Sequence, residues 1–205
     1  MSVRVKVCGI TRSEDAASAA RLGANAIGFI FWHKSPRYVS PEIARQIAES
    51  LPAFVATVGV YVDPDPAWVE ETSQKARLSL LQFHGDETAD YCNQFSLPYI
   101  KAVRVKADTD LLQYAKSYSA AKGLLLDTYA VGMPGGTGER FDWQLIPSHL
   151  PLPLILSGGL NPENVEMAIK QTRPWAVDVS SGVEAAKGIK DEQKIYAFMQ
   201  GVKQS

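Results

Sequence analysis

Two side chains at the ends of predicted strands, Cys8 and Asp127, are suited to act as the base and the acid of one reaction. Cys8 ends the run 3–8, and Asp127 ends the apolar run 123–127. Successive residues of a strand face opposite sides, so Cys8 shares a face with Lys6, whose charge favours a thiolate. A thiolate and a carboxylic acid predict general acid–base chemistry. The alternatives are a packing role for the thiol and a turn cap for Asp127.

Two glycine-containing turns near the C-terminus are typical of anion binding. Gly158 and Gly159 follow a predicted strand and precede Asn161, where we expect a helix to begin. Glycines let the backbone approach an anion, and the free N–H groups at a helix start point towards it. The next strand ends in the second turn, which consists of Ser180, Ser181 and Gly182. Each turn alone is ordinary, but on consecutive strands they predict a phosphate site.

Other polar residues have weaker signals. Arg37, in the segment 34–38, has a planar guanidinium that could hold a carboxylate, or it is a solvated surface arginine. His84 is expected to form a local hydrogen bond, and Cys92 is expected to pack inside a helix. The three histidines are scattered and lack metal-ligand spacing, so we expect no metal and no organic cofactor.

Composition excludes several classes of partner. The chain has 205 residues, 46% apolar and 21% charged, with a net charge of −1. Such a charge gives no field that would attract nucleic acid or an anionic membrane. We expect neither a signal peptide nor a membrane span, because no apolar run approaches the required length. With two cysteines, a disulfide framework is not expected, and the predicted location is the reducing cytoplasm.

The elements that must position these residues follow a βα rhythm of roughly 25 residues per unit. We expect eight strands, at residues 3–8, 26–31, 55–62, 78–83, 99–105, 123–127, 154–156 and 176–179. An amphipathic helix is expected after each, beginning near residues 11, 40, 63, 86, 108, 141, 161 and 191. The interpretation is an α/β chain that forms one (β/α)₈ TIM-barrel domain over residues 1–205.

The positions of the glycine-rich loops favour this closed barrel over an open doubly wound sheet. A doubly wound sheet carries a GxGxxG turn after its first strand, but residues 8–11 here read CGIT. The glycine-rich loops instead follow the sixth, seventh and eighth strands, and barrel phosphate sites lie after the last two. The loop at residues 129–140 is long, and its glycines would permit closure over a ligand.

The whole chain resembles the phosphoribosylanthranilate isomerase family of tryptophan biosynthesis. The matching segments run in order: KVCGIT (6–11), GFIF (28–31), SPRY (35–38), QFHGD (82–86), LLDT (125–128), GGTG (135–138), FDW (141–143), LSGGLNP (156–162) and VDVSSGVE (177–184). The resemblance implies an Amadori rearrangement of N-(5-phosphoribosyl)anthranilate, an aldose–ketose isomerisation and the third step of tryptophan synthesis from chorismate.

The resemblance also implies roles for individual residues. Cys8 would be the general base, Asp127 the general acid, and Arg37 the ligand of the anthranilate carboxylate. The phosphate would be bound by Gly158, Gly159, Ser180, Ser181 and Gly182, with Asp178 and His84 in support. The expected partner is a small phosphorylated substrate, without nucleic acid or membrane. The chain would be a monomer or a homodimer.

Three other functions are weighed against this one. A histidine-pathway isomerase would need an aspartate in place of Cys8 and a second phosphate site, where this chain has Asp63, Asp65, Asp86 and Glu87. A metal-dependent pentose-phosphate epimerase would need convergent histidine and aspartate ligands. A catalytically silent barrel that binds a phosphorylated metabolite would keep the phosphate loops while losing Cys8 or Asp127, and both are present.

Overall fold

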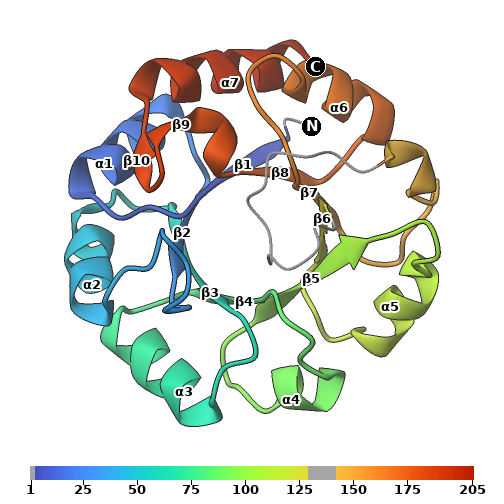
Figure 1. Cartoon of the computed structure of the whole chain (residues 1–205), viewed down its shortest axis with the longest axis horizontal. Coiled ribbons are helices and arrows are strands. Elements are labelled where there is room, and N and C mark those ends of the chain that lie inside the picture. The colour runs from blue at the N-terminus through green and yellow to red at the C-terminus, as the bar shows by residue number, and fades with distance from the viewer. Residues whose placement is uncertain (1–2, 129–141) are drawn as a thin grey trace.

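Eight parallel strands form a closed barrel in the computed structural model, which describes residues 3–128 and 142–205. Each strand pairs with the next in sequence, and β1 also pairs with β8, which closes the sheet (Figure 1). The strands are β1 (Arg4–Cys8), β2 (Ala26–Ile30), β3 (Ala56–Tyr61), β4 (Leu80–Phe83), β5 (Tyr99–Val105), β6 (Leu124–Thr128), β7 (Leu154–Leu156) and β8 (Ala176–Val179). The predicted TIM-barrel fold is confirmed.

Helices surround the strands as an outer ring (Figure 1). They are α1 (Ser13–Leu22), α2 (Pro41–Ser50), α3 (Pro66–Lys75), α4 (Ala89–Asn93), α5 (Leu111–Ser117), α6 (Val165–Thr172) and α7 (Glu192–Gln204). Local chemistry sets their ends: the Ser40 hydroxyl accepts from the Ile43 N–H at the start of α2, and Gly23 ends α1 in the left-handed conformation. Among the described residues, no helix has the length and apolar character needed to cross a bilayer.

Side-chain alternation along the strands separates the core from the site. On β1, Val5 and Val7 pack in the apolar cluster that lies under the helices. Lys6, on the other face of the same strand, is buried and forms an ion pair with Asp178 of β8. Leu125 of β6 belongs to a separate apolar cluster with Ile100, Ala102, Ile155 and Ala176. The alternation therefore places the polar groups of several strands on one common inner face.

The structure corrects the predicted helix starts in the second half. Where a helix was expected from residue 141, the described part is the 3₁₀ turn η1 (Trp143–Leu145). Helix α6 begins at Val165 rather than near Asn161, because the Asn161 side chain accepts from the N–H groups of Glu163 and Asn164 and holds a turn there. The glycine-rich loop at 129–140 lies outside the described residues.

An additional hairpin follows β8 that the sequence analysis did not predict. The 3₁₀ turn η2 (Ser181–Val183) leads into β9 (Glu184–Ala186), which pairs antiparallel with β10 (Ile189–Lys190). Figure 1 shows this hairpin in front of α1, beside the end of β1. It brings Glu184 and Lys190 to the end of the barrel at which Cys8 lies.

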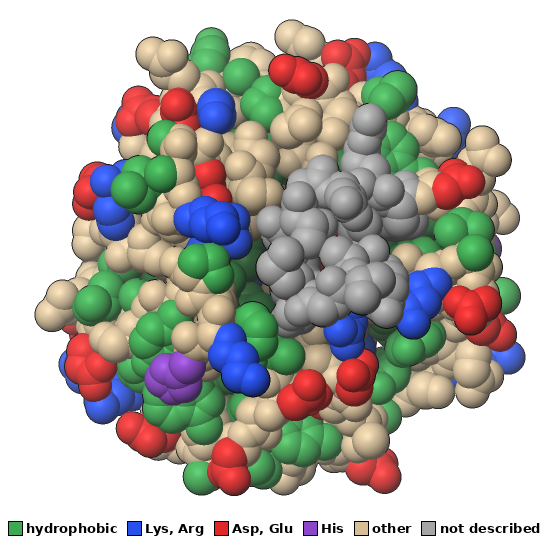
Figure 2. Space-filling view, viewed as in Figure 1, with side chains coloured by type: hydrophobic (Ala, Val, Ile, Leu, Met, Phe, Trp, Pro, Cys, Tyr) green, Lys and Arg blue, Asp and Glu red, His purple; other side chains and the backbone are tan. Residues whose placement is uncertain are grey.

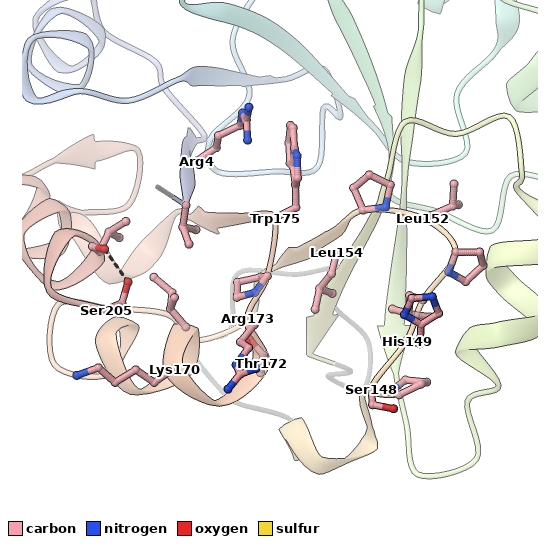
Figure 3. Close-up of a pocket in the computed structure, with 18 of the residues that line it drawn as sticks. Arg4, Ser148, His149, Leu152, Leu154, Lys170, Thr172, Arg173, Trp175 and Ser205 are labelled. Atoms are coloured by element: carbon pink, nitrogen blue, oxygen red, sulfur yellow. Dashed lines mark hydrogen bonds between the residues drawn. The ribbon is translucent and has the colours of Figure 1, made fainter. Parts of the chain in front are cut away.

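The opposite end of the barrel has a larger cleft, about 1060 Å³ in volume (Figure 3). It lies where β1, β7 and β8 begin, and the Arg4 guanidinium stacks over the Trp175 ring at 4.3 Å from its centre. His149 and Leu152 also line it. Neither Cys8 nor Asp127 reaches this cleft, and catalytic groups of TIM barrels lie at the other end. Size alone therefore does not locate the site.

Candidate active site

The C-terminal ends of the strands enclose a cavity of about 360 Å³ that collects nearly all the predicted site residues. Those lining it are Cys8, Arg37, His84, Asp127, Gly158, Gly159, Asp178, Ser180 and Ser181. Figure 2 views this end of the molecule, where several Lys and Arg side chains lie around the middle of the face. Among the residues described, no three His, Cys, Asp or Glu side chains are grouped so that they could hold a metal ion.

Cys8 ends β1 with its thiol beside the backbone of β2. Gly28 is its partner in register, and a Cβ at Gly28 would lie 2.9 Å from the Cys8 sulfur, so glycine leaves room for the thiol. Burial raises the pKa of Cys8; Lys6 opposes this increase but does not overcome it, and Asp178 adds to it. Lys6 thus favours the thiolate, as expected from the shared face, but burial outweighs its charge.

Lys6 is held by a buried ion pair. Its Nζ lies 2.9 Å from Oδ1 of Asp178, and both residues are about 5% exposed. Burial alone would lower the pKa of Lys6, but the charges of Asp178 and Cys8 and the hydrogen bonds to them raise it to about 12. Lys6 is thus a permanent cation beside the thiol. Asp178 fixes this cation through the ion pair, and its supporting role in the reaction stays a prediction.

Asp127 takes part in a chain of hydrogen bonds that joins the ends of β4 and β6. Its Oδ2 lies 2.9 Å from Nε2 of His84, and the other ring nitrogen, Nδ1, lies 2.8 Å from Nε2 of Gln82. All three side chains are buried and line the cavity. His84 therefore makes the local hydrogen bond that the sequence analysis expected, and its partner is the predicted acid.

Arg37 is buried and rigidly held, so the alternative of a solvated surface arginine is wrong. Its Nε and Nη2 donate to the two carboxylate oxygens of Glu184 at 2.7 and 2.8 Å. The hydrogen bond to Glu184 raises the pKa of Arg37. This two-point ion pair does not involve Nη1. Arg37 also lines the cavity. The guanidinium is thus fixed in one plane, as binding of a carboxylate requires.

Glu184 also binds a second cation. Lys190 Nζ lies 2.9 Å from Oε1 of Glu184 and 3.1 Å from the carbonyl oxygen of Ser180. Burial lowers the pKa of Lys190, although the charge of Glu184 opposes this. One carboxylate therefore connects Arg37 with the Ser180 loop.

The two predicted phosphate loops lie against each other. Gly158 and Gly159 have φ angles of 83° and 65°, which favour glycine. A Cβ at Gly182 would lie 1.9 Å from the carbonyl oxygen of Leu160, so only glycine permits this contact. Gly182 itself does not line the cavity. The two loops thus form one continuous wall.

The donors offered by this wall differ from those predicted. The N–H groups of Glu163 and Asn164, near the start of α6, donate to the side chain of Asn161 and do not face an anion. Within residues 3–128 and 142–205, no acceptor pairs with the N–H groups of Gly159 and Ser181. Backbone groups of the loops themselves, rather than the helix start, are therefore the donors left for an anion.

Three residues of the site were not among the predicted ones: Gln82, Glu184 and Lys190. Gln82 and Glu184 lie inside the segments QFHGD and VDVSSGVE, so their place in a family motif was the signal that the sequence offered. Both are buried in the structure. Lys190 had none, because the hairpin that places it was not predicted. All three act by contact with a predicted residue.

This geometry defines a class of protein: a (β/α)₈-barrel enzyme with a thiol and a carboxyl group in one cavity beside anion-binding loops. The comparison with protein families specifies it further. Residues 5–201 match the family model "N-(5'phosphoribosyl)anthranilate (PRA) isomerase", and the chain belongs to this family of isomerases. Family membership excludes the histidine-pathway isomerase and the pentose-phosphate epimerase.

Similar proteins agree along the full chain. The N-(5'-phosphoribosyl)anthranilate isomerase of Nitrosospira multiformis is 68% identical over 98% of this chain and 97% of its own. That of Nitrosomonas europaea is 65% identical over 99% and 96%. The crystal structure of phosphoribosyl anthranilate isomerase from Thermotoga maritima has a TM-score of 0.90 at 44% identity, covering 99% of this chain and 100% of that one. Another isomerase structure, with reduced 1-(o-carboxyphenylamino)-1-deoxyribulose 5-phosphate bound, has a TM-score of 0.84 at 42% identity and the same coverage.

Proposed function

We propose that this protein converts N-(5-phosphoribosyl)anthranilate into 1-(2-carboxyphenylamino)-1-deoxyribulose 5-phosphate, with Cys8 as general base and Asp127 as general acid. The observation that carries the assignment of roles is that Cys8, Asp127, Arg37 and both glycine-containing loops line one cavity. The reaction is the Amadori rearrangement that forms the third step of tryptophan synthesis from chorismate. Family membership supports the reaction, and the cavity supports the residues.

The two anionic ends of the substrate fit two parts of the cavity wall. The loops at Gly158–Gly159 and Ser180–Ser181 would take the phosphate through backbone N–H groups. Arg37 would take the anthranilate carboxylate through Nη1, the nitrogen that Glu184 leaves outside its ion pair. A substrate fixed at both ends has its ribose carbons held between base and acid, which removes most of the orientational cost of reaction.

The first chemical step is ring opening. The carboxylic acid of Asp127 gives its proton to the ribose ring oxygen as the C1–O bond breaks, and the nitrogen lone pair forms the C=N⁺ bond of a Schiff base. The ring oxygen becomes the C4 hydroxyl. His84, at 2.9 Å, fixes the direction of the Asp127 carboxyl group. Asp127 must therefore begin each turnover protonated.

The second step is proton removal at C2. Cys8, as thiolate, takes this proton, and the electron pair moves to the Schiff base nitrogen to give an enolamine. The enolamine becomes the ketone when its C2 hydroxyl loses a proton and C1 gains one, so Cys8 loses a proton and Asp127 regains one over the turnover. Since burial raises the pKa of Cys8, the opposing charge of Lys6 supports formation of the thiolate.

The test is loss of substrate fluorescence with the wild type, Cys8→Ser and Asp127→Asn. General acid–base groups contribute roughly 10²- to 10⁴-fold each, so we expect both variants to lose turnover by at least this order while the thermal unfolding midpoint is kept. Near-normal activity in either variant would refute its role. A wild type that binds the substrate without turning it over would instead indicate the silent barrel.

Cellular context forms part of the same proposal. Both cysteines are free and buried, which supports a reducing cytoplasmic location. The substrate is a small phosphorylated molecule, and residues 1–205 act as one domain in a monomer or homodimer. A Thermotoga maritima structure is described as monomers of a dimeric isomerase. Light scattering decides between the two states, and an assembly of any other size would contradict this part.

A further inference from the structure

We propose that Gln82 is a positioning residue whose side-chain amide rotates to stabilise either tautomer of His84. Each tautomer then forms a hydrogen bond with one form of Asp127, protonated or ionised. This inference rests on the proposed function of Asp127 as the acid. Gln82 is on β4, 1% exposed, with its amide nitrogen 2.8 Å from Nδ1 of His84. The other ring nitrogen of His84 is 2.9 Å from Asp127.

The observation that calls for an explanation is the second end of the amide. The Oε1 atom of Gln82 is buried and has no hydrogen-bond partner within the described part of the chain. Buried polar atoms are nearly always paired, because an unpaired one has lost its bond to water without replacement. An amide whose carbonyl is unpaired is not locked by its surroundings in one orientation.

Rotation of the amide by half a turn exchanges two groups of nearly equal size. The nitrogen is a donor and the oxygen an acceptor, so each orientation suits a different state of Nδ1. When the nitrogen faces the ring, Nδ1 must be unprotonated to accept. When the oxygen faces the ring, Nδ1 must carry a proton to donate. The orientation of Gln82 is therefore linked to the tautomer of His84.

The tautomer in turn fixes the hydrogen bond to Asp127. With Nδ1 unprotonated, the single proton of neutral His84 is on Nε2 and is donated to the Asp127 carboxylate. With Nδ1 protonated, the lone pair of Nε2 accepts from the carboxylic acid of Asp127. The second arrangement holds one proton more, and that proton is the one given to the ribose ring oxygen. After the transfer, the Nε2 lone pair faces the carboxylate until His84 gives its Nδ1 proton to solvent and takes one on Nε2, an exchange that conserves its single proton.

Gln82 thus provides a partner for His84 before and after the proton leaves Asp127. The proton that the C2 hydroxyl of the enolamine releases restores the protonated form of Asp127. A side chain with only one kind of polar group, or with none, would stabilise a single tautomer. The Gln82 amide offers both kinds of group within hydrogen-bond distance of Nδ1, which explains its place beside His84.

The test combines Gln82→Leu and Gln82→Glu with ¹⁵N NMR of the histidine ring and a pH profile of kcat. In the wild type, lowering the pH should move the His84 proton from Nε2 to Nδ1. In Gln82→Leu the proton should stay on Nε2, with kcat lowered roughly 10- to 100-fold, below the full effect of an acid, and KM unchanged. In Gln82→Glu, a carboxylate that only accepts should hold the Nδ1 proton to higher pH and shift the kcat profile upwards.

A matched variant and a readout independent of turnover separate this inference from a general structural effect and from the proposed function. Gln113→Leu, on the exposed face of α5, is a matched substitution that should leave the tautomer and kcat unchanged. If Gln82→Leu does not fold, Gln82→Glu alone still decides, through its pH profile. The same His84 tautomer and the same pH profile in every variant would overturn the inference. The ring signals need no turnover, so an inactive wild type would reject the proposed function without deciding the role of Gln82.

Discussion

Replacement of Glu184 by glutamine tests how far one carboxylate holds the site together. Glu184 accepts from Arg37 at 2.7 and 2.8 Å, from Lys190 at 2.9 Å and from the N–H of Gly188 at 3.3 Å. It is 8% exposed, so these contacts are shielded from water. Glu184→Gln keeps the shape and removes the charge, leaving two buried cations without their counter-ion.

The magnitude follows from the burial. Breaking a buried ion pair by removing one partner costs about 3–5 kcal/mol. A chain of this size loses roughly 2–4 °C in unfolding midpoint per kcal/mol, so we expect a decrease on the order of 10 °C. Inorganic phosphate should stabilise Glu184→Gln more than the wild type, since it neutralises the freed charge of Lys190 beside the Ser180 loop.

The pH dependence gives a second measurement on the same variant. Burial raises the pKa of Glu184, but the hydrogen bond from Arg37 and the charge of Lys190 outweigh this and leave it below the ordinary 4.5. A lowered pKa stabilises the fold above the ordinary value, and this contribution is lost as the pH falls through the folded value. The wild type should thus lose stability below pH 4.5, and Glu184→Gln should lose less.

Thermal unfolding followed by circular dichroism is the assay, with Glu192→Gln as the matched control. Glu192 is exposed and pairs with Arg21 at 2.8 Å, so solvent screens the pair and its loss should change the midpoint far less. A Glu184→Gln midpoint as close to the wild type as that of the control would show that the carboxylate does not hold two buried cations, and the reasoning would be refuted.

Two further predictions concern Cys8 and the phosphate wall. Because Lys6 lowers the pKa of a thiol that burial has raised, Lys6→Met should raise it further, so alkylation of Cys8 should need a higher pH; an unchanged alkylation profile in a Cys92→Ala background would contradict this. Gly182→Ala places a Cβ 1.9 Å from the Leu160 carbonyl oxygen, which should cost about 1–3 kcal/mol and raise the KM. An unchanged KM would show that the wall does not bind the phosphate.

The closed barrel could be predicted because its signals are local. Apolar runs, helix caps such as Ser40, and the absence of a GxGxxG turn at residues 8–11 each act over a few residues. Alternation along β1 and β6 then placed Cys8 and Asp127 on the inner face, and both line the cavity. Each of these patterns can be recognised within a single strand, helix start or turn.

What could not be predicted depends on contacts between distant segments. Lys6 lowers the pKa of Cys8, as its place on the same strand face predicts, but burial by the rest of the barrel outweighs that charge. Glu184 meets Arg37 across 147 positions of sequence, and Lys190 is placed by an unpredicted hairpin. The Asn161 turn likewise delays α6, because side-chain hydrogen bonds compete with the helix.

The central claim is that acid and base are separate residues acting in sequence, and trapping of the ring-opened intermediate tests it most directly. Phosphoribosylanthranilate is incubated with each variant and cyanoborohydride, which reduces the Schiff base. Cys8→Ser keeps Asp127, so it should open the ring and yield trapped amine well above the level without protein. Asp127→Asn should yield only that background level. Trapping by Asp127→Asn but not by Cys8→Ser would contradict the assignment of both residues.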